Sequence, residues 1–499
     1  MAFINTSFCS IKNLPRKLNA FLKENYPLHF YDMRLDETAA NIAYFLEPMR
    51  ADLKVVLEFP YLDKVYRDSY YTYFSTKHKD YPKDCVRLSF FEPDIVEEDY
   101  GTISAQNKLQ AAFLGYCVVR PLKEKAVGRN LLNRRAMKIQ DFDCCQHTET
   151  ALIGGLKLSI TGFSHSSQDG ETISCAETTI WAMMEYFSHK YPEYKPTLPS
   201  NILAQLNPFH HTRMLPSNGL TIEQISFALK QFGFGTLTYS KDADGKYFKD
   251  LLHVYVESGI PLVSVIEDPK INSGHAQIII GRSKPNWEKL SRLVGRAKEM
   301  VDFAAGVDCL VFQDDNLPPY QLMKWNKPTS AYPVAEGFGG FRLSGFVVPL
   351  YRKVYLEAAK AKKFFLEAFY EIREAQTTNK LIFRMYLASS RSFKAHVAAQ
   401  FLMPSGLRDT IMAVSMPKFV WCAEFFDNVG VLNQEPCTLM LLDATEYSDY
   451  WKDSFIFAAH SSGAQIKIEN PELIKLYDTT VFVTEQGLKG FKAYSSNLI

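Results

Sequence analysis

Short apolar runs separated by polar turns constrain the fold of this chain more than any other feature of its sequence. Such runs are typical of β-strands, and amphipathic stretches such as Thr38 to Leu53 predict helices between them. This mixture predicts an α+β protein. We predict strands at 86–91, 114–119, 260–266, 275–281, 308–313, 381–386, 419–422, 438–442 and 455–459.

Length and composition indicate a folded protein with more than one domain. Hydrophobic residues make up 47% of the 499 residues and charged residues 22%, close to the averages of globular proteins. A single hydrophobic core rarely serves more than about 250 to 300 residues. We expect an N-terminal α+β region at 1–150, a central domain at 151–350 and a C-terminal α+β region at 351–499. The last region is predicted to begin with a long helix from Tyr351 to Ala375.

The charge of the chain gives no sign of a nucleic-acid or membrane partner. Its 56 basic and 55 acidic residues leave a net charge of +1, whereas nucleic-acid-binding domains are usually strongly basic. No stretch reaches the ~18 apolar residues of a membrane span. The first ten residues lack the basic and apolar regions of a signal peptide. We therefore expect a cytoplasmic protein that binds neither nucleic acid nor a membrane.

The nine cysteines are scattered and odd in number, which is typical of a reducing compartment. Cys144-Cys145-Gln146-His147 is the densest group, and the other ligands of a tetrahedral zinc site are not in view. The sequence therefore predicts no metal and no other cofactor.

One cysteine stands where a nucleophile is favoured. Cys175 lies where a loop that carries Gln168 and Gly170 turns into an amphipathic helix ended by Pro192. The unpaired N–H groups and the dipole of a helix start stabilise negative charge, which favours the thiolate form. Cys175 is a candidate nucleophile, and a buried structural cysteine is the alternative. The helix has its apolar stripe at Ile180, Met183, Met184 and Phe187.

Strand register supplies partners for this thiol. His275 begins one predicted strand, and Asp314 lies at the end of another. If the two strands are antiparallel with Gly281 opposite Asp308, His275 falls opposite Asp314. Because cross-strand Cβ atoms are only about 4.5 to 5.5 Å apart, the carboxylate can orient the imidazole toward Cys175. The register thus predicts a Cys-His-Asp triad.

These motifs resemble the papain-like cysteine peptidases. The Gly274–Arg282 run is similar to the bacteriocin-processing branch, which removes double-glycine leaders, and to its bacterial relatives. The resemblance covers 160–325, about a third of the chain. It implies a papain-like core, in which a helix carrying the cysteine packs on an antiparallel sheet carrying the histidine and the aspartate. It also implies these roles: Cys175 as nucleophile, His275 as general base and acid, Asp314 as orienting residue and Gln168 as oxyanion donor.

Some features depart from the family pattern. Gln168 lies seven residues before Cys175, where papain-type enzymes usually have six, and the Trp that follows the nucleophile in papain is absent. If the strand slips or bulges, Asp315 or Asn316 takes the place of Asp314.

A further departure is an insertion between the His-bearing and Asp-bearing strands. Residues 282–307 are rich in Lys and Arg, and their apolar positions predict an amphipathic helix. The helix is either a lid or docking surface for a partner protein, or a cover for the sheet edge. Its apolar positions are Leu290, Leu293, Val294, Ala297 and Val301.

The predicted activity is acyl transfer through a thioester. With water as the acceptor, the protein is a cysteine peptidase that hydrolyses peptide or amide bonds of a peptide or protein substrate. The same residues would serve a deamidase, a transglutaminase or another acyltransferase. A papain-like scaffold whose site is unused is the non-enzymatic alternative.

Overall fold

The computed structural model describes residues 4–122, 126–209, 214–216, 219–271, 273–296, 300–372, 381–461, 480–484 and 488–498. These residues divide into two compact units. Unit 1 comprises 1–233, 263–279 and 311–347, and unit 2 comprises 234–262, 280–310 and 348–499. These discontinuous units do not coincide with the three contiguous regions predicted from the sequence. The reason is that the later boundaries between the units fall inside strands, which local sequence patterns treat as undivided.

Unit 1 contains a seven-stranded sheet in which every neighbouring pair of strands is antiparallel. Two of its strands, β3 and β4, coincide within one residue with the predicted runs at 86–91 and 114–119. The strand order is β1 (Asn5–Ser10), β2 (Lys54–Tyr61), β3 (Cys85–Phe91), β4 (Phe113–Val119), β5 (Val127–Leu132), β8 (Leu156–His165) and β7 (His147–Ile153).

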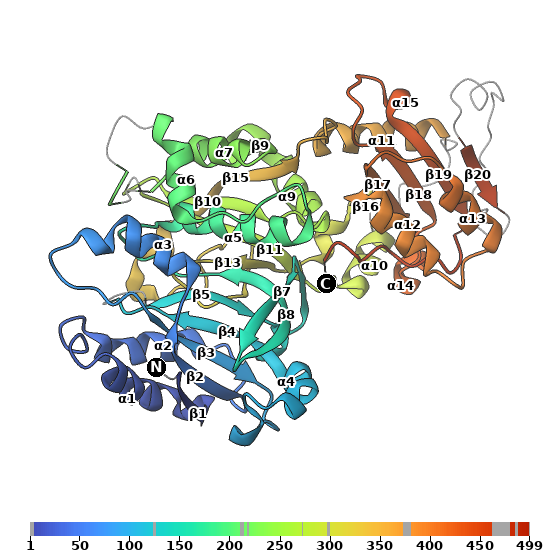
Figure 1. The fold of residues 1–499 in the computed structure, drawn as a ribbon. Helices are drawn as coiled ribbons and strands as arrows, with labels where there is room; N and C mark the ends of the chain where they lie inside the picture. The colour runs from blue at the N-terminus through green and yellow to red at the C-terminus, as the bar shows by residue number, and fades with distance from the viewer. Residues whose placement is uncertain are drawn as a thin grey trace. The chain divides into compact units, whose positions relative to one another are not determined.

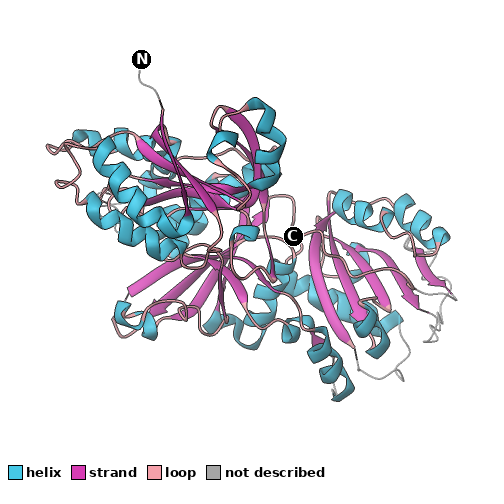
Figure 2. Ribbon diagram, turned by 90° about the horizontal axis from the view of Figure 1, so that it is seen from below, coloured by secondary structure: helices cyan, strands magenta, loops and turns pink. Residues whose placement is uncertain are grey.

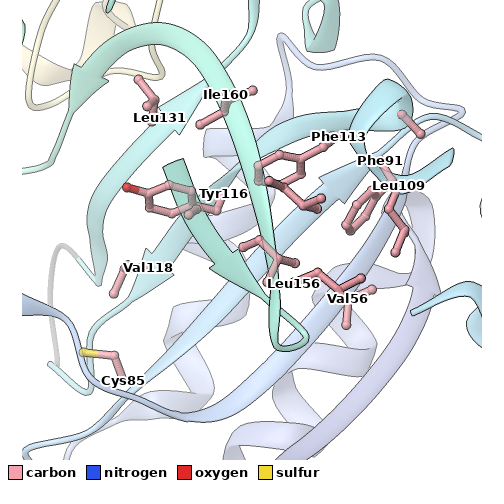
Figure 3. Close-up of a cluster of buried hydrophobic side chains, with 14 of the residues drawn as sticks. Val56, Cys85, Phe91, Leu109, Phe113, Tyr116, Val118, Leu131, Leu156 and Ile160 are labelled. Atoms are coloured by element: carbon pink, nitrogen blue, oxygen red, sulfur yellow. The ribbon is translucent and has the colours of Figure 1, made fainter. Parts of the chain in front are cut away.

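Buried apolar side chains cluster on this sheet (Figure 3). Phe91, Phe113 and Tyr116 come from β3 and β4, and Leu131 and Ile160 come from β5 and β8. Each is at most 4% exposed. Burial of such a side chain contributes about 1.5 to 3 kcal/mol, so the cluster is a main source of the stability of unit 1.

A second sheet carries the candidate histidine, on the part of its strand that belongs to unit 1. Its strand order is β14 (Gln321–Met323), β13 (Leu310–Gln313), β11 (Ser273–Ser283), β10 (Leu262–Asp268) and β15 (Arg342–Tyr351). β6 (Phe142–Cys144) also pairs with β11, and β10 runs antiparallel to β15. The sequence-based prediction that the strands bearing His275 and preceding Asp314 are neighbours is confirmed.

The helices of unit 1 lie beside these sheets (Figures 1 and 2). The predicted helix from Thr38 to Leu53 ends early, because Lys54 already begins β2 and the chain must turn before it. The helices are α1 (Leu14–Asn25), α2 (Thr38–Leu46), α3 (Lys64–Thr72), α4 (Gln106–Ala112), α5 (Cys175–Lys190), α6 (Pro199–Leu206) and α7 (Ile222–Gln231).

Unit 2 is built on a six-stranded sheet. Its central pairs are antiparallel, whereas β12 pairs with β16, and β19 with β20, in parallel. Its four central strands begin within one residue of the runs predicted at 381–386, 419–422, 438–442 and 455–459. The strand order is β12 (Val301–Asp302), β16 (Ile382–Ser389), β17 (Phe419–Phe426), β18 (Thr438–Asp443), β19 (Phe455–Ser461) and β20 (Thr480–Thr484).

The remaining elements of unit 2 are mostly helices. The predicted long helix from Tyr351 to Ala375 begins only at Ala358. Tyr351 is instead the last residue of β15, and Tyr355 is 58% exposed and so does not belong to a buried stripe. Residues 373–380 lie outside the described residues. The elements are β9 (Phe234–Ser240), next to β15 in the strand order, and α8 (Lys241–Asp244), α9 (Phe248–Glu257), α10 (Trp287–Arg296), α11 (Ala358–Ile372), α12 (Ser390–Ala398), α13 (Ser405–Ala413), α14 (Asn428–Asn433) and α15 (Trp451–Ser454).

The predicted insertion helix is α10, in unit 2. Leu290 and Val294 are fully buried in a cluster that includes Phe303 and Phe426 of the same unit. These two residues therefore pack within unit 2, whereas Leu293 on the same helix is 36% exposed. Ala297 lies outside the described residues, and Val301 belongs to β12 instead of the helix.

Among the described residues, no helix combines the length and the apolar character needed to cross a membrane. The predicted α+β class is confirmed, with antiparallel pairing predominating in the sheets.

Candidate active site

Cys175 is the first residue of α5, as the sequence predicts. The N–H of Ser174, which precedes it, donates to Oε2 of Glu177 at 3.1 Å, and Thr178 Oγ1 donates to the carbonyl of Ser174 at 2.8 Å. These bonds fix the first turn of the helix. The predicted apolar stripe of α5 is buried. Cys175 itself is half-buried.

The loop before Cys175 is organised by one buried carboxylate. Oδ1 of Asp169 accepts the N–H groups of Glu171, Thr172 and Ile173 at 2.9, 2.7 and 3.0 Å. Gly170 has a φ of +77°, a left-handed conformation that glycine adopts without strain. Asp169 therefore fixes the path of the chain from Gln168 into the start of the helix.

His275 lies near the start of β11 and is buried, with 7% of its surface exposed. Its Nε2 atom is 3.0 Å from Oδ1 of Asp314, 3.2 Å from the hydroxyl of Tyr332 and 3.6 Å from Oδ1 of Asp315. Phe338 packs edge-on against the imidazole at 5.8 Å between ring centroids and stacks on Tyr332 at 4.0 Å. The histidine thus has a carboxylate partner and an aromatic cover.

The Asp314 carboxylate is held by donors on both oxygen atoms. Oδ1 accepts the N–H of Asn316 at 2.9 Å, and Oδ2 accepts Nε2 of Gln277 at 2.6 Å and the hydroxyl of Tyr332. Its backbone carbonyl lies 2.9 Å from Nε2 of His165. These contacts leave Asp314 little freedom to rotate away from the imidazole.

Charge and burial shift the pKa values of this group in opposite directions. Burial alone lowers the pKa of His275, but the charge of Asp314, its hydrogen bond and a hydrogen bond with the Cys175 side chain raise it well above 6.5. Burial raises the pKa of Asp314, but the nearby His275 and hydrogen bonds from His275, Tyr332 and Asn316 bring it down to about 2. Burial and the Asp314 charge raise the pKa of Tyr332, which keeps its hydroxyl a proton donor. These directions favour an imidazolium paired with a carboxylate.

The imidazole therefore links Cys175 to Asp314. Because Nε2 faces Asp314, the ring nitrogen that can exchange a proton with the Cys175 sulfur is Nδ1. This is the arrangement in which a histidine takes a proton from a thiol and is oriented by a carboxylate. The structure brings together the three residues that the sequence suggested as a triad.

Gln168 is held by contacts of both its side chain and its backbone. Its Nε2 atom donates to Oδ1 of Asn316 at 2.9 Å, so one of its two N–H bonds is already used. Arg120 holds the backbone of the same loop by donating to the carbonyls of Ser167 and Gln168, each at 3.1 Å. Asn316, the partner of Gln168, also lines a cavity of about 120 Å³ together with Ser167 and Asp315, among other residues.

Beyond the predicted strand at 275–281, β11 continues to Ser283. There the N–H of Ser283 donates to the carbonyl of Cys309 at 2.9 Å. At the other end of the pair, Asp314 lies one residue beyond the end of β13 and contacts His275 from that position.

The alternative third residues have other positions. Asp315 lies farther from Nε2 than Asp314 does, at 3.6 Å compared with 3.0 Å. Asn316 directs its backbone N–H to Asp314 and its side chain to Gln168 and Tyr332. Neither replaces Asp314 on the imidazole.

Several residues of the site were not identified from the sequence. Gln277 had a usable signal, because it lies two residues after His275 and a strand alternates its faces. Asp169, followed by glycine ahead of a helix start, is typical of an Asx turn and could also have been found. No sequence signal pointed to Tyr332 or His165, because each lies far along the chain from the residue that it contacts.

Two groups of described residues have donor atoms close enough for a metal ion. In one, Glu185 is paired with Lys64 at 3.0 Å, and Glu149 with Arg129 at 3.3 Å, while His189 is the third member. The other is the set of His275, Asp314 and Asp315, in which Asp314 already accepts several hydrogen bonds. The carboxylates of Glu149, Glu185 and Asp314 thus already form ion pairs or hydrogen bonds with other groups of the protein. We therefore assign no metal to either group.

No protein-family model matches this sequence, and none of the curated proteins matches it.

Proposed function

We propose that the protein is a papain-like cysteine hydrolase that cleaves peptide or amide bonds with Cys175, His275 and Asp314. Two observations carry this proposal: the 3.0 Å contact of His275 with Asp314, and the position of Cys175 at the start of α5, where its side chain raises the pKa of the same imidazole. A structural cysteine has no need of a buried imidazole whose other nitrogen is held by a carboxylate. Catalysis by a thiol requires that arrangement.

The proposed reaction starts from a Cys175 thiolate beside a protonated His275, the pair that results when the thiol has given its proton to Nδ1. The thiolate attacks the substrate carbonyl, and the resulting oxyanion is stabilised by N–H groups at the helix start and by Gln168. Nδ1 returns the proton to the leaving amine as the C–N bond breaks, which gives a thioester. Water then loses a proton to Nδ1 and attacks the thioester, and the collapse of this second tetrahedral intermediate restores the thiolate.

Asp314 makes the proton cycle possible without being protonated itself. Its negative charge stabilises the imidazolium that forms in both halves of the cycle. A pKa of about 2 keeps it ionised at neutral pH. Tyr332 and Gln277 hold the carboxylate in the plane where it can meet Nε2.

The test compares the rate at which iodoacetamide alkylates Cys175 with the rates at Cys9 and Cys309. All three thiols are half-buried. Burial raises the pKa of Cys9 to about 11, which slows its alkylation, so Cys309 is the matched internal control. We expect Cys175 to react at least tenfold faster at pH 7 and to lose this advantage in His275→Ala. The variant His396→Ala, in unit 2, is the control for loss of a histidine. Equal alkylation of all three thiols would overturn the proposal.

Hydrolysis itself is tested with peptide and amide libraries, comparing wild type with Cys175→Ala. Release of a new amine by wild type alone supports a hydrolase. Incorporation of an added primary amine in place of water would identify an acyltransferase instead.

A further inference from the structure

Asn316 connects two parts of the candidate site that are far apart in the sequence. Its Oδ1 accepts the Gln168 side chain at 2.9 Å, and its backbone N–H donates to Oδ1 of Asp314 at 2.9 Å. Its Nδ2 donates to the hydroxyl of Tyr332 at 3.4 Å. The oxyanion donor and the orienting carboxylate are thus joined through one residue.

The polarity of this network is set by Asp314. An ionised carboxylate only accepts hydrogen bonds, so the Tyr332 hydroxyl must donate to it and present its own oxygen to Asn316. Asn316 must therefore turn its Nδ2 toward Tyr332 and its Oδ1 toward Gln168. An amide oxygen facing Gln168 requires that Gln168 present its NH₂ group and not its oxygen.

We infer that Asn316 is a positioning residue that fixes the amide of Gln168 with its NH₂ group toward the oxyanion. Arg120 fixes the backbone of Gln168, and Asn316 fixes its side chain. One N–H of that amide is used by Asn316, and the second is the donor for the oxyanion. This inference rests on the proposed function, because it assigns a role within that reaction.

The inference separates two kinds of reaction at Cys175. Alkylation by iodoacetamide forms a C–S bond without an oxyanion and so does not need Gln168. With a peptide aldehyde, the thiolate adds to the carbonyl carbon and forms a hemithioacetal, whose oxygen occupies the oxyanion position. Asn316 should affect the second reaction and not the first.

The experiment measures both reactions in wild type, Asn316→Ala, Gln168→Ala and the double variant. We expect Asn316→Ala to weaken inhibition by a peptide aldehyde about tenfold to a hundredfold. This is less than the ~10²- to 10³-fold loss on complete removal of an oxyanion donor, because Gln168 itself remains. The rate of alkylation should stay within about twofold of wild type. In the Gln168→Ala background, Asn316→Ala should cost nothing further, since residues that act through each other are not additive.

Asn316→Asp is the conservative variant, because it keeps an oxygen that can accept from Gln168. It should retain more aldehyde affinity than Asn316→Ala. The inference would be overturned if the losses of aldehyde affinity were additive in the double variant, or if the rate of alkylation fell in parallel with aldehyde affinity. Either result would leave the proposed roles of Cys175, His275 and Asp314 unaffected. Slow alkylation of Cys175 in wild type would overturn the proposed function and this inference together.

Discussion

The Nε2 atom of His275 lies 3.0 Å from Oδ1 of Asp314, and both side chains are almost fully buried. An ion pair in such surroundings is weakly screened, so each group strongly affects the ionisation of the other. This relationship sets the pH range over which the site can work and gives the first prediction.

Replacing the carboxylate should move the pH dependence of activity. Asp314 raises the pKa of His275 through its charge and its hydrogen bond, so Asp314→Asn should lower the pKa of His275. The leaving amine needs a protonated His275, and the alkaline limb of kcat/KM should therefore shift to lower pH. The rate at the optimum should fall about 10²- to 10⁴-fold. Asp308→Asn, which removes a carboxylate paired with Lys289, is the matched control.

The same shift affects stability. A histidine whose pKa is raised on folding stabilises the native state fully below about pH 6.5, and this contribution is lost as the pH rises through the folded-state pKa. Chemical denaturation from pH 6 to 10 should show that the difference between wild type and Asp314→Asn shrinks with pH. A difference that is constant or grows would contradict the assignment.

Tyr332 should act on the reaction through Asp314. Tyr332→Phe removes a donor from Oδ2 but keeps the ring that stacks on Phe338. Since a hydrogen bond to a charged group contributes about 1.5 to 3 kcal/mol, kcat should fall about 10- to 100-fold, with little change in KM. Tyr320→Phe is the control, because that buried hydroxyl bonds only to backbone groups of Phe163 and Leu132 among its described partners. An unchanged kcat in Tyr332→Phe would contradict the role of the hydroxyl.

Asp169 should control the rigidity of the loop before Cys175. Asp169→Ala removes the acceptor of three backbone N–H groups, so the amides of Glu171, Thr172 and Ile173 should exchange hydrogen much faster. Misplacement of the helix start should slow alkylation of Cys175 about tenfold. Asp427→Ala removes a comparable acceptor in unit 2 and should leave both measurements at Cys175 unchanged. Wild-type exchange rates in Asp169→Ala would show that the loop is held by other contacts.

A buried ion-pair network should dominate the stability of unit 2. Glu257 is fully buried between Arg282 and Arg384, and Arg384 also bonds Glu424 at 2.7 Å. Glu257→Gln leaves buried guanidinium groups without their full counter-charge and should cost about 3 to 5 kcal/mol in the free energy of unfolding, measured with urea. The exposed pair of Lys360 and Asp449 is the control, and Asp449→Asn should leave the unfolding midpoint unchanged. Equal effects of the two variants would argue against the network.

Local sequence patterns determined the elements that carry the chemistry. Apolar stripes, β-rich runs and a helix-start pattern depend on neighbours a few residues apart, so Cys175 at the start of α5 and His275 on β11 were predictable. The proximity of His275 and Asp314 was also anticipated, because the two strands were expected to be neighbours.

Tertiary structure decided which side chains complete the site. Tyr332 lies 57 residues from His275, and Asn316 lies 148 residues from Gln168, so no local pattern relates either pair. These contacts form because the fold brings segments that are distant in the sequence close together. Asp314 can only accept hydrogen bonds when it is ionised, and this fixes the direction of each bond in the network. The sequence by itself determined where Cys175 and His275 stand in their elements, whereas the folded chain decided how Asp314 and Gln168 are held.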